Sequence, residues 1–201
     1  MNAPTPPHPE GFARQRDRHI VALRHGSLLA RTGPGAPDVP ARGTGTPLET
    51  PGAMTTIFEK IRRDHDALRR AIREATEAID PAGKVATLGR LTRALRIHDD
   101  AERSSIYTAL LSHERGRELG TEASEMHRTL EAMVSDLVAM TPDTPDRDIC
   151  LQELAQTLEH HFRWEQERLF PAAHFLFGAS AQQRLGEIYD EAKRRAHDVA
   201  A

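Results

Sequence analysis

The chain has 201 residues, of which 28% are charged and 4% are aromatic, and its formal net charge is −3. This length fits one domain with an attached tail, and the charge balance lacks the basic excess that marks nucleic-acid or membrane-surface binding, so we expect neither partner. A single cysteine, Cys150, excludes an intramolecular disulfide and fits a reducing compartment, which favours a cytoplasmic location. No apolar run approaches the ~18–20 residues of a membrane span.

Residues 1–53 differ in composition from the rest of the chain. Residues 1–52 hold nine of the thirteen prolines and seven of the thirteen glycines. Such a segment buries little apolar surface, so we predict a disordered extension without a fold of its own. Its one apolar stretch, HIVALRHGSLLA, is interrupted by Arg24 and His25 and makes a poor signal peptide. Because Met54 directly precedes a helix start, we expect the natural chain to begin there.

From Met54 onward the sequence predicts only helices, since segments rich in Ala, Leu, Arg and Glu follow one another without an alternating strand pattern. The stretch Thr56-Ile-Phe-Glu59 has the form of a capping box and opens a first helix over about 56–79. Asp80-Pro-Ala-Gly83 ends that helix, and a second helix covers about 84–113.

The second half of the chain repeats this organisation. A third helix over about 121–141 is followed by Pro145 at the first position of a fourth, which extends to about 170, where Pro171 kinks or ends it. Ser180-Ala-Gln-Gln183 is a second capping box that starts a shorter helix to about 196. We therefore predict an all-α fold over residues 54–201, an antiparallel up-down four-helix bundle with a short fifth helix.

Polar residues interrupt the apolar stripe of every long helix. The stripe of the first helix, with Ile61 and Leu68, passes through position 65, and the other three stripes behave in the same way. The residues that should point inward are His65, His98 with Glu102, His127, and His161 with Glu165.

The spacing of these residues is repeated along the chain. His98 and His161 are 63 residues apart, as are Glu102 and Glu165, and the pattern H…HxxxE occurs twice. Residues at i and i+4 lie on one face of a helix, so each HxxxE offers a nitrogen and an oxygen side by side. Facing helices would then bring four imidazoles and two carboxylates to one level of the bundle.

A metal site explains this pattern. A buried, ionised carboxylate without compensation costs several kcal/mol, and no lysine or arginine lies on these stripes. Imidazoles with bridging carboxylates suit iron, manganese or zinc, and two shared glutamates suit two ions better than one. Glu131 lies off its stripe and is expected at the surface or behind a ligand, and His160, on the flank of its own stripe, is expected behind a ligand or in solvent. The sequence leaves open whether either one contributes to the site. Tyr107, Trp164 and Phe170 are expected to pack the bundle, and Cys150 to be a buried thiol.

The motifs RRDHDALR, IHDDAERSSIYTAL, SEMHRTL and HHFRWEQERLFP together resemble the haemerythrin-like, HHE cation-binding domains, over roughly residues 54–196. The resemblance implies that His65 and His98 hold one iron, that His127 and His161 hold the other, and that Glu102 and Glu165 bridge the pair. Oxygen-carrying haemerythrins have a further histidine one turn before the third-helix ligand, where this chain has Ala123. Two open irons would favour redox turnover of a small molecule over simple oxygen transport.

Three functions remain open from the sequence. The first is a non-haem di-iron protein that binds or turns over dioxygen, peroxide or nitric oxide in stress defence or sensing. The second is a non-enzymatic module that stores iron or senses iron or oxygen through a metal-dependent fold. The third is a metal-free helical interaction domain. A ferritin-like oxidase is set aside, because no histidine follows a glutamate by three residues. The sequence is silent on the oligomeric state and the redox partner.

Overall fold

A computed structural model gives the structure of the protein and describes residues 55–199. All secondary structure in this part of the chain is helical. The elements in chain order are α2 (Ile57–Glu77), α3 (Pro81–Glu102), the π-helical turn η1 (Arg103–Tyr107), α4 (Thr108–Ser112), α5 (Arg117–Ala139), α6 (Pro145–Trp164), the π-helical turn η2 (Glu165–Leu169), α7 (Phe170–Leu176) and α8 (Ala179–Val199). The predicted extension over residues 1–53 lies outside the described residues and stays a prediction.

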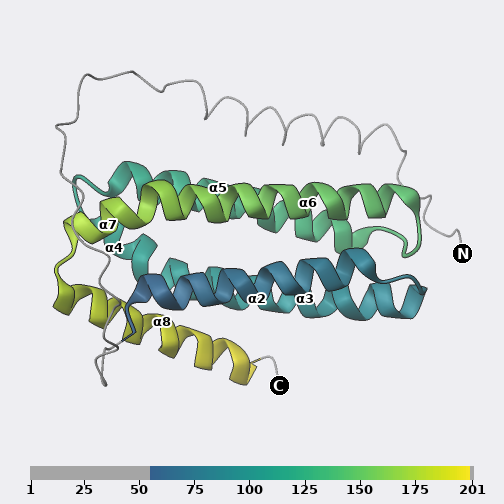
Figure 1. Cartoon of the computed structure of the whole chain (residues 1–201), viewed down its shortest axis with the longest axis horizontal. Helices are drawn as coiled ribbons and strands as arrows, with labels where there is room; N and C mark the ends of the chain where they lie inside the picture. The colour runs from purple at the N-terminus through teal and green to yellow at the C-terminus, as the bar shows by residue number, and fades with distance from the viewer. Residues whose placement is uncertain (1–54, 200–201) are drawn as a thin grey trace, which may run out of the picture. The chain divides into compact units, whose positions relative to one another are not determined.

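These elements form four long rods that run up and down and a fifth that packs outside them, which confirms the predicted bundle (Figure 1). The second rod is continuous through α3, η1 and α4, and the fourth is continuous through α6, η2 and α7. The rod of α2 packs against α3 and α6, and α5 packs against α6 and the second rod. Helix α8 lies on α2, α3 and η1. The fifth helix is not short, because α8 has 21 residues, as many as α2.

The helix ends follow capping chemistry, in part as predicted. Thr56 and Glu59 form both hydrogen bonds of the expected capping box. Asp80 belongs to the start of α3 and not to the end of α2, since its carboxylate accepts a hydrogen bond from the Gly83 backbone N–H at 2.8 Å. A Cβ at position 83 would lie 2.7 Å from Asp80 Oδ2, so a larger residue there would displace the capping carboxylate.

Two helix boundaries differ from the prediction. Pro171 does not end the fourth rod, which continues to Leu176, because the proline lies in the first turn of α7, where a missing N–H is tolerated. Ser180 does not open the fifth helix, since α8 begins one residue earlier. The carbonyl of Gly178 accepts the first backbone hydrogen bonds of α8, and the Gln182 side chain donates to the carbonyl of Phe177.

The buried residues form two apolar clusters at different levels of the bundle. One contains Ile61 on α2 and Ala123 on α5, and the other contains Leu68 and Leu130 on the same two helices. Each predicted histidine lies between members of the two clusters along its own helix. The polar layer is therefore enclosed by apolar packing above and below, which keeps bulk water from its side chains.

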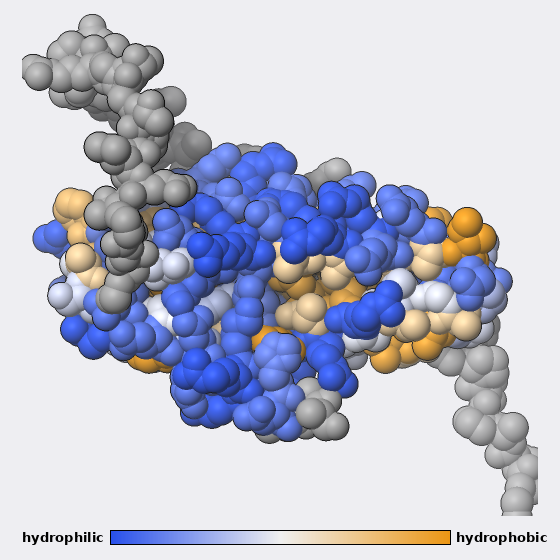
Figure 2. All heavy atoms as spheres, turned by 60° about the horizontal axis from the view of Figure 1, so that its bottom comes forward, coloured by the Kyte–Doolittle hydropathy of each residue, from blue (hydrophilic) through white to orange (hydrophobic). Residues whose placement is uncertain are grey.

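The outer surface is mostly polar. The face of the molecule drawn in Figure 2 is covered largely by hydrophilic residues, with hydrophobic residues gathered in a few separate areas. Among the described helices, none combines the length and the apolar character that crossing a membrane requires.

Candidate metal centre

The six predicted site residues meet at one level of the bundle and are buried. Their exposed fractions are 0% for His65, 4% for His98, 0% for Glu102, 4% for His127, 1% for His161 and 0% for Glu165. They come from all four rods, as their apolar stripes predict. Charged residues are seldom fully buried without a partner, so the arrangement demands compensation from within this layer.

Glu102 contacts histidines of three different helices. Its Oε1 lies 3.8 Å from His65 Nε2. Its Oε2 lies 3.3 Å from His98 Nε2 and 3.2 Å from His127 Nε2. One carboxylate thus reaches both halves of the cluster, which is the position that a bridging ligand would need.

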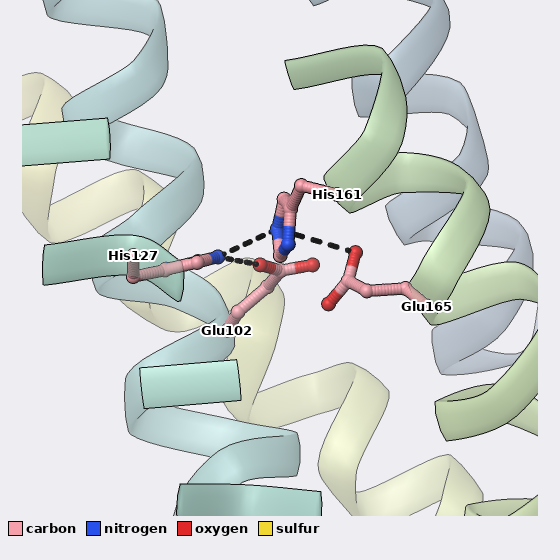
Figure 3. Close-up of side chains that lie close together, drawn as sticks. All are labelled: Glu102, His127, His161 and Glu165. Atoms are coloured by element: carbon pink, nitrogen blue, oxygen red, sulfur yellow. Dashed lines mark hydrogen bonds and ion pairs between the residues drawn. The ribbon is translucent and has the colours of Figure 1, made fainter. Parts of the chain in front are cut away.

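Glu165 approaches the cluster from the fourth rod, beside His161 (Figure 3), and it also reaches both halves. Its Oε2 is 3.1 Å from His65 Nε2 and 3.7 Å from His161 Nε2. The Nε2 atoms of His127 and His161 lie 2.8 Å apart. The donor atoms fall into two groups that share Glu102, each within 4.8 Å internally: Glu102, His127, His161 and Glu165 form one, and His65, His98 and Glu102 form the other.

Several buried nitrogen and oxygen atoms of the cluster lack hydrogen-bond partners. Among the described residues, eight buried side-chain nitrogen or oxygen atoms form no hydrogen bond, and six of the eight belong to the predicted site: both ring nitrogens of His65, Nε2 of His98, Oε1 of Glu102, Nδ1 of His161 and Oε2 of Glu165. Buried polar atoms are normally satisfied, so such a concentration at one place is what metal ligands show without their metal. The donor set of imidazoles and carboxylates fits a divalent or trivalent transition metal.

Residues outside the predicted set hold two of the histidines by their Nδ1 atoms. Asp99 Oδ1 pairs with Nδ1 of His127, and the hydroxyl of Tyr189 lies 3.2 Å from Nδ1 of His98. Tyr189 in turn donates to Asp64 at 2.5 Å. Carboxylates behind histidine ligands fix the ring orientation and leave Nε2 free for a metal. The sequence analysis missed these partners, although Asp64 and Asp99 directly adjoin the histidines at positions 65 and 98.

Lys193 completes this arrangement from α8. Its ammonium lies 2.6 Å from both carboxylate oxygens of Asp64. Although burial opposes the charge on Asp64, hydrogen bonds from His98, Lys193 and Tyr189 lower its pKa to about 2. Helix α8 therefore takes part in orienting the ligands, a role that its place outside the four-helix core did not suggest.

Tyr107 reaches the centre of the cluster. Its ring is packed in the core and is 1% exposed, as expected for a packing residue. Its hydroxyl, however, lies 2.9 Å from Glu102 Oε2, 2.6 Å from Glu165 Oε1 and 2.9 Å from His127 Nε2. The prediction that Tyr107 only packs the bundle was therefore incomplete. The 63-residue repeat that relates the predicted ligands also pairs Tyr107 with Phe170. This pairing could have indicated that position 107 lies near the site.

The histidines carry protons unequally when no metal is bound. Burial opposes a charge on His65, but the two glutamates raise its pKa to about 9. Burial also opposes a charge on His127, whose pKa is raised to about 10 by Asp99 and by the nearer glutamate. Burial lowers the pKa of His161 to about 3. At neutral pH, protons on His65 and His127 thus balance the carboxylates, and a metal ion would replace them.

The remaining candidates lie outside the centre. His160 is exposed, and Glu131 is exposed and pairs with Arg103 at 2.5 Å. Trp164 packs in the core and donates to Glu122, and Phe170 is buried near His65, with ring centroids 6.4 Å apart. Cys150 is half-buried rather than fully buried.

A cavity of about 460 Å³ leads to the cluster between α3, α5 and α6. His98, His127 and His161 form part of its wall. The apolar part of the wall is formed by Leu95, Leu130, Val134, Val138, Leu158 and Phe162. The cavity has the volume and lining of a small-molecule site, so ligands have a route to the histidines.

Comparison with known proteins gives the same picture. A family model described as the hemerythrin HHE cation binding domain matches residues 56–173. A solved structure of an HHE cation binding domain-containing protein from Mycobacterium kansasii aligns with a TM-score of 0.65 and 21% identity, over 73% of this chain and 90% of that one. At this identity the likeness shows the fold alone.

A curated relative extends beyond the matched part. A protein described as a DNA nickase, from Nostoc sp., is 30% identical over 119 residues, which are 58% of this chain and 33% of that protein. The chain thus spans about a third of the length of this relative.

Proposed function

Because this chain belongs to the haemerythrin HHE cation-binding family, we propose that it is a non-haem di-iron protein that binds or turns over a small oxidant, namely dioxygen, peroxide or nitric oxide. The family implies metal binding, and the buried cluster of histidines and glutamates supports it. The proposed ligands are His65, His98, Glu102, His127, His161 and Glu165. The observation that carries the proposal is the concentration of buried, unsatisfied donor atoms on these residues.

Two metal ions fit the cluster better than one. The donor atoms form two groups, and each glutamate lies within 4 Å of histidines from both. Two carboxylates and four imidazoles around two ions leave coordination positions for an external ligand. Iron held there would supply redox chemistry with small oxidants. Manganese and zinc accept the same donors, so the metal has to be identified by measurement.

The protein's own residues would orient the site and restrict access to it. Asp99 and Tyr189 hold His127 and His98 in position through Nδ1. The two apolar clusters exclude water above and below the donor layer, and the cavity admits a small molecule from one side. Among residues 55–199, no acid or base besides the ligands and Tyr107 lies in the centre, so any turnover should be metal-centred.

Elemental analysis tests the proposal, with two adjacent histidines as a matched pair. The purified protein should contain about two irons per chain, and His161→Ala should lose at least one of them. His160→Ala should retain both, because that side chain is exposed and outside the cluster. A protein that binds no iron after anaerobic loading with ferrous iron, or equal loss in the two variants, would rule the site out. Full zinc occupancy would keep the site and remove the oxidant chemistry, and full manganese occupancy would keep the site and require that chemistry to be revised.

A second function, sensing or storage through a metal-dependent fold, has one observation in its favour. The donor layer separates the two apolar clusters, so loss of the metal would leave unsatisfied polar atoms in the middle of the core. A sensor would lose helicity or become protease-sensitive on metal removal, whereas an enzyme would mainly lose activity.

We infer a cytoplasmic protein without a nucleic-acid partner, on the basis of the net charge and the single cysteine. The nickase description concerns a relative about three times as long as the shared part, and we propose that the shared part is the metal-binding bundle.

A further inference from the structure

We propose that the groove between α3 and α8 is a binding site for a nucleotide. The groove has a volume of about 650 Å³ and is lined by residues of α3, η1 and α8, where α8 packs on the outside of the four rods (Figure 1). This volume is in the range of pockets that hold small organic ligands. The proposal does not depend on the metal centre, because none of the six proposed metal ligands lines the groove.

The groove has a local excess of positive charge, although the chain as a whole has a net charge of −3. Asp100 is the single acidic residue among the described residues of its lining. Four arginines line the same groove, namely Arg93, Arg96, Arg103 and Arg195. An anion is therefore the ligand that the groove attracts.

The protein neutralises these arginines only in part. Arg103 forms ion pairs with two carboxylates, each at 2.5 Å. Among residues 55–199, Arg93 and Arg96 form no ion pair, and Arg195 pairs only through Nε, 3.5 Å from Glu191 Oε1. Like charges one helical turn apart repel each other, and an anion bound between them would remove this repulsion.

A phosphate group is the anion that fits these side chains. Guanidinium groups bind phosphate oxygens through two parallel hydrogen bonds, and a phosphate ester carries up to two negative charges at neutral pH. Arg93 and Arg96 approach the groove from α3, and Arg195 approaches it from α8. A phosphate between the two helices would therefore receive donors from both walls.

The polar residues farther along α3 suit the sugar of a nucleotide. Asp100 follows Arg96 by four residues, about 6 Å along a helix, and Ser104 follows Asp100 by one more turn. A carboxylate accepts hydrogen bonds from hydroxyl groups, and a serine hydroxyl both donates and accepts them. A carboxylate would repel a phosphate but binds the hydroxyl groups of a sugar, so its presence beside the arginines favours a nucleotide over a simple anion.

Small and apolar residues leave space for the base. Ile97, Ala192 and Ala196 give the groove an apolar surface. Gly89 lies in the interior of α3, where glycine weakens a helix relative to alanine. A Cβ at Gly89 would meet no atom within 4 Å, so packing among the described residues does not require a glycine at this position. The space beside it is open to a ligand.

Calorimetric titration of the iron-loaded full chain with AMP, GMP, CMP and UMP tests the proposal. Inorganic phosphate and adenosine are titrated in parallel, because each carries only part of the nucleotide. We expect at least one nucleotide to bind at a single site. Phosphate and adenosine should each bind at least about tenfold more weakly, since each lacks some of the charged or polar contacts.

Two pairs of arginines provide matched variants. Arg93→Gln on α3 and Arg195→Gln on α8 should each weaken nucleotide binding about tenfold, because each removes a charged donor from the groove. Arg90→Gln and Arg194→Gln are the controls on the same two helices. Both control side chains lie outside the lining and pair with glutamates, at 3.6 Å and 2.5 Å, so the affinity should not change.

Gly89→Leu separates the shape of the groove from its charge. The added side chain narrows the groove and leaves every charged residue in place. It should weaken binding of the nucleotide by about tenfold and leave binding of inorganic phosphate unchanged. Equal effects on the two ligands would contradict the placement of the base beside this glycine.

The other outcomes are equally decisive. The proposal is overturned if none of the nucleotides binds, or if Arg93→Gln and Arg90→Gln bind the nucleotide equally well. Inorganic phosphate that binds as tightly as the nucleotides would show a simple anion site instead. Duplex DNA that binds more tightly than any nucleotide, and loses this affinity in Arg93→Gln, would show a nucleic-acid surface instead. These results do not depend on iron content, so a failure of the proposed metal site leaves them interpretable.

Discussion

At the scale of single residues, the cluster depends on carboxylates that do not face its centre. Asp99 pairs with His127 Nδ1. Burial and this pairing both change the pKa values of the two groups. Burial opposes the charge on Asp99, but His127 lowers the pKa of this carboxyl to about 2. The carboxylate therefore stays ionised through the physiological range, fixes the ring of His127 and increases the basicity of its Nε2.

We expect Asp99→Asn to weaken metal binding by about 10- to 100-fold, because a neutral amide holds the ring less firmly and makes it a poorer donor. Competition with a chelator at pH 7 measures the affinity. Asp100→Asn is the matched control, since it removes a neighbouring carboxylate that is not paired with His127. Equal affinity in the two variants would show that the contact with Asp99 is not needed for binding.

At the scale of helices, the apolar stripes were sufficient to predict the bundle and to bring six residues together. The stripes in the second and fourth rods also held a signal that the prediction did not use. Positions 98, 102, 106 and 110 are all buried and are separated by three steps of four, as are 161, 165, 169 and 173. An α-helix has 3.6 residues per turn, so positions that are repeatedly four residues apart drift around the helix. The π-helical turns η1 and η2 contain more residues per turn and keep these positions on one face.

Other parts of the site could not be read from helical periodicity. Asp64 and Tyr189 are 125 residues apart, and only the packing of α8 on α2 and α3 brings the aspartate, the tyrosine and His98 together. A pattern within one helix carries no information about which face of a distant helix will cover it. The cavity between α3, α5 and α6 likewise depends on how three helices diverge, which a single stripe does not determine.

We expect Val134→Phe to slow the reaction of the reduced, iron-loaded protein with peroxide or nitric oxide by about tenfold, equivalent to ~1.4 kcal/mol of barrier. Val134 is half-buried and lines the cavity that leads to the histidines, so the larger ring narrows the route without removing a ligand. Stopped-flow absorbance measures the rate at equal iron content. Val85→Phe, an exposed position on α3, should leave the rate unchanged. An unaltered rate in Val134→Phe would place the access route elsewhere.

At the scale of the whole molecule, the donor layer couples the fold to protons and metal. Without metal, the charges on His65 and His127 offset those on Glu102 and Glu165, in the middle of the bundle. Their pKa values, about 9 and about 10, lie above the ordinary value of 6.5. A raised pKa in the folded state stabilises the fold fully below the unfolded value, and this contribution disappears as the pH rises through the folded value. His161, with its pKa lowered to about 3, has the opposite effect and destabilises the fold as the pH falls below 6.5.

The metal-free protein should therefore be most stable near pH 6.5 and should lose on the order of a few kcal/mol of unfolding free energy between pH 6.5 and 10. Urea unfolding followed by circular dichroism at intervals across this range measures the trend. The metal-loaded protein should not show this alkaline loss, because the metal replaces the protons on His65 and His127 and needs both rings neutral. Its stability should instead fall in acid, as protons compete with the metal for the same nitrogens. If the metal-free protein became more stable from pH 6.5 to 10, those two histidines would not be the groups that balance the buried glutamates.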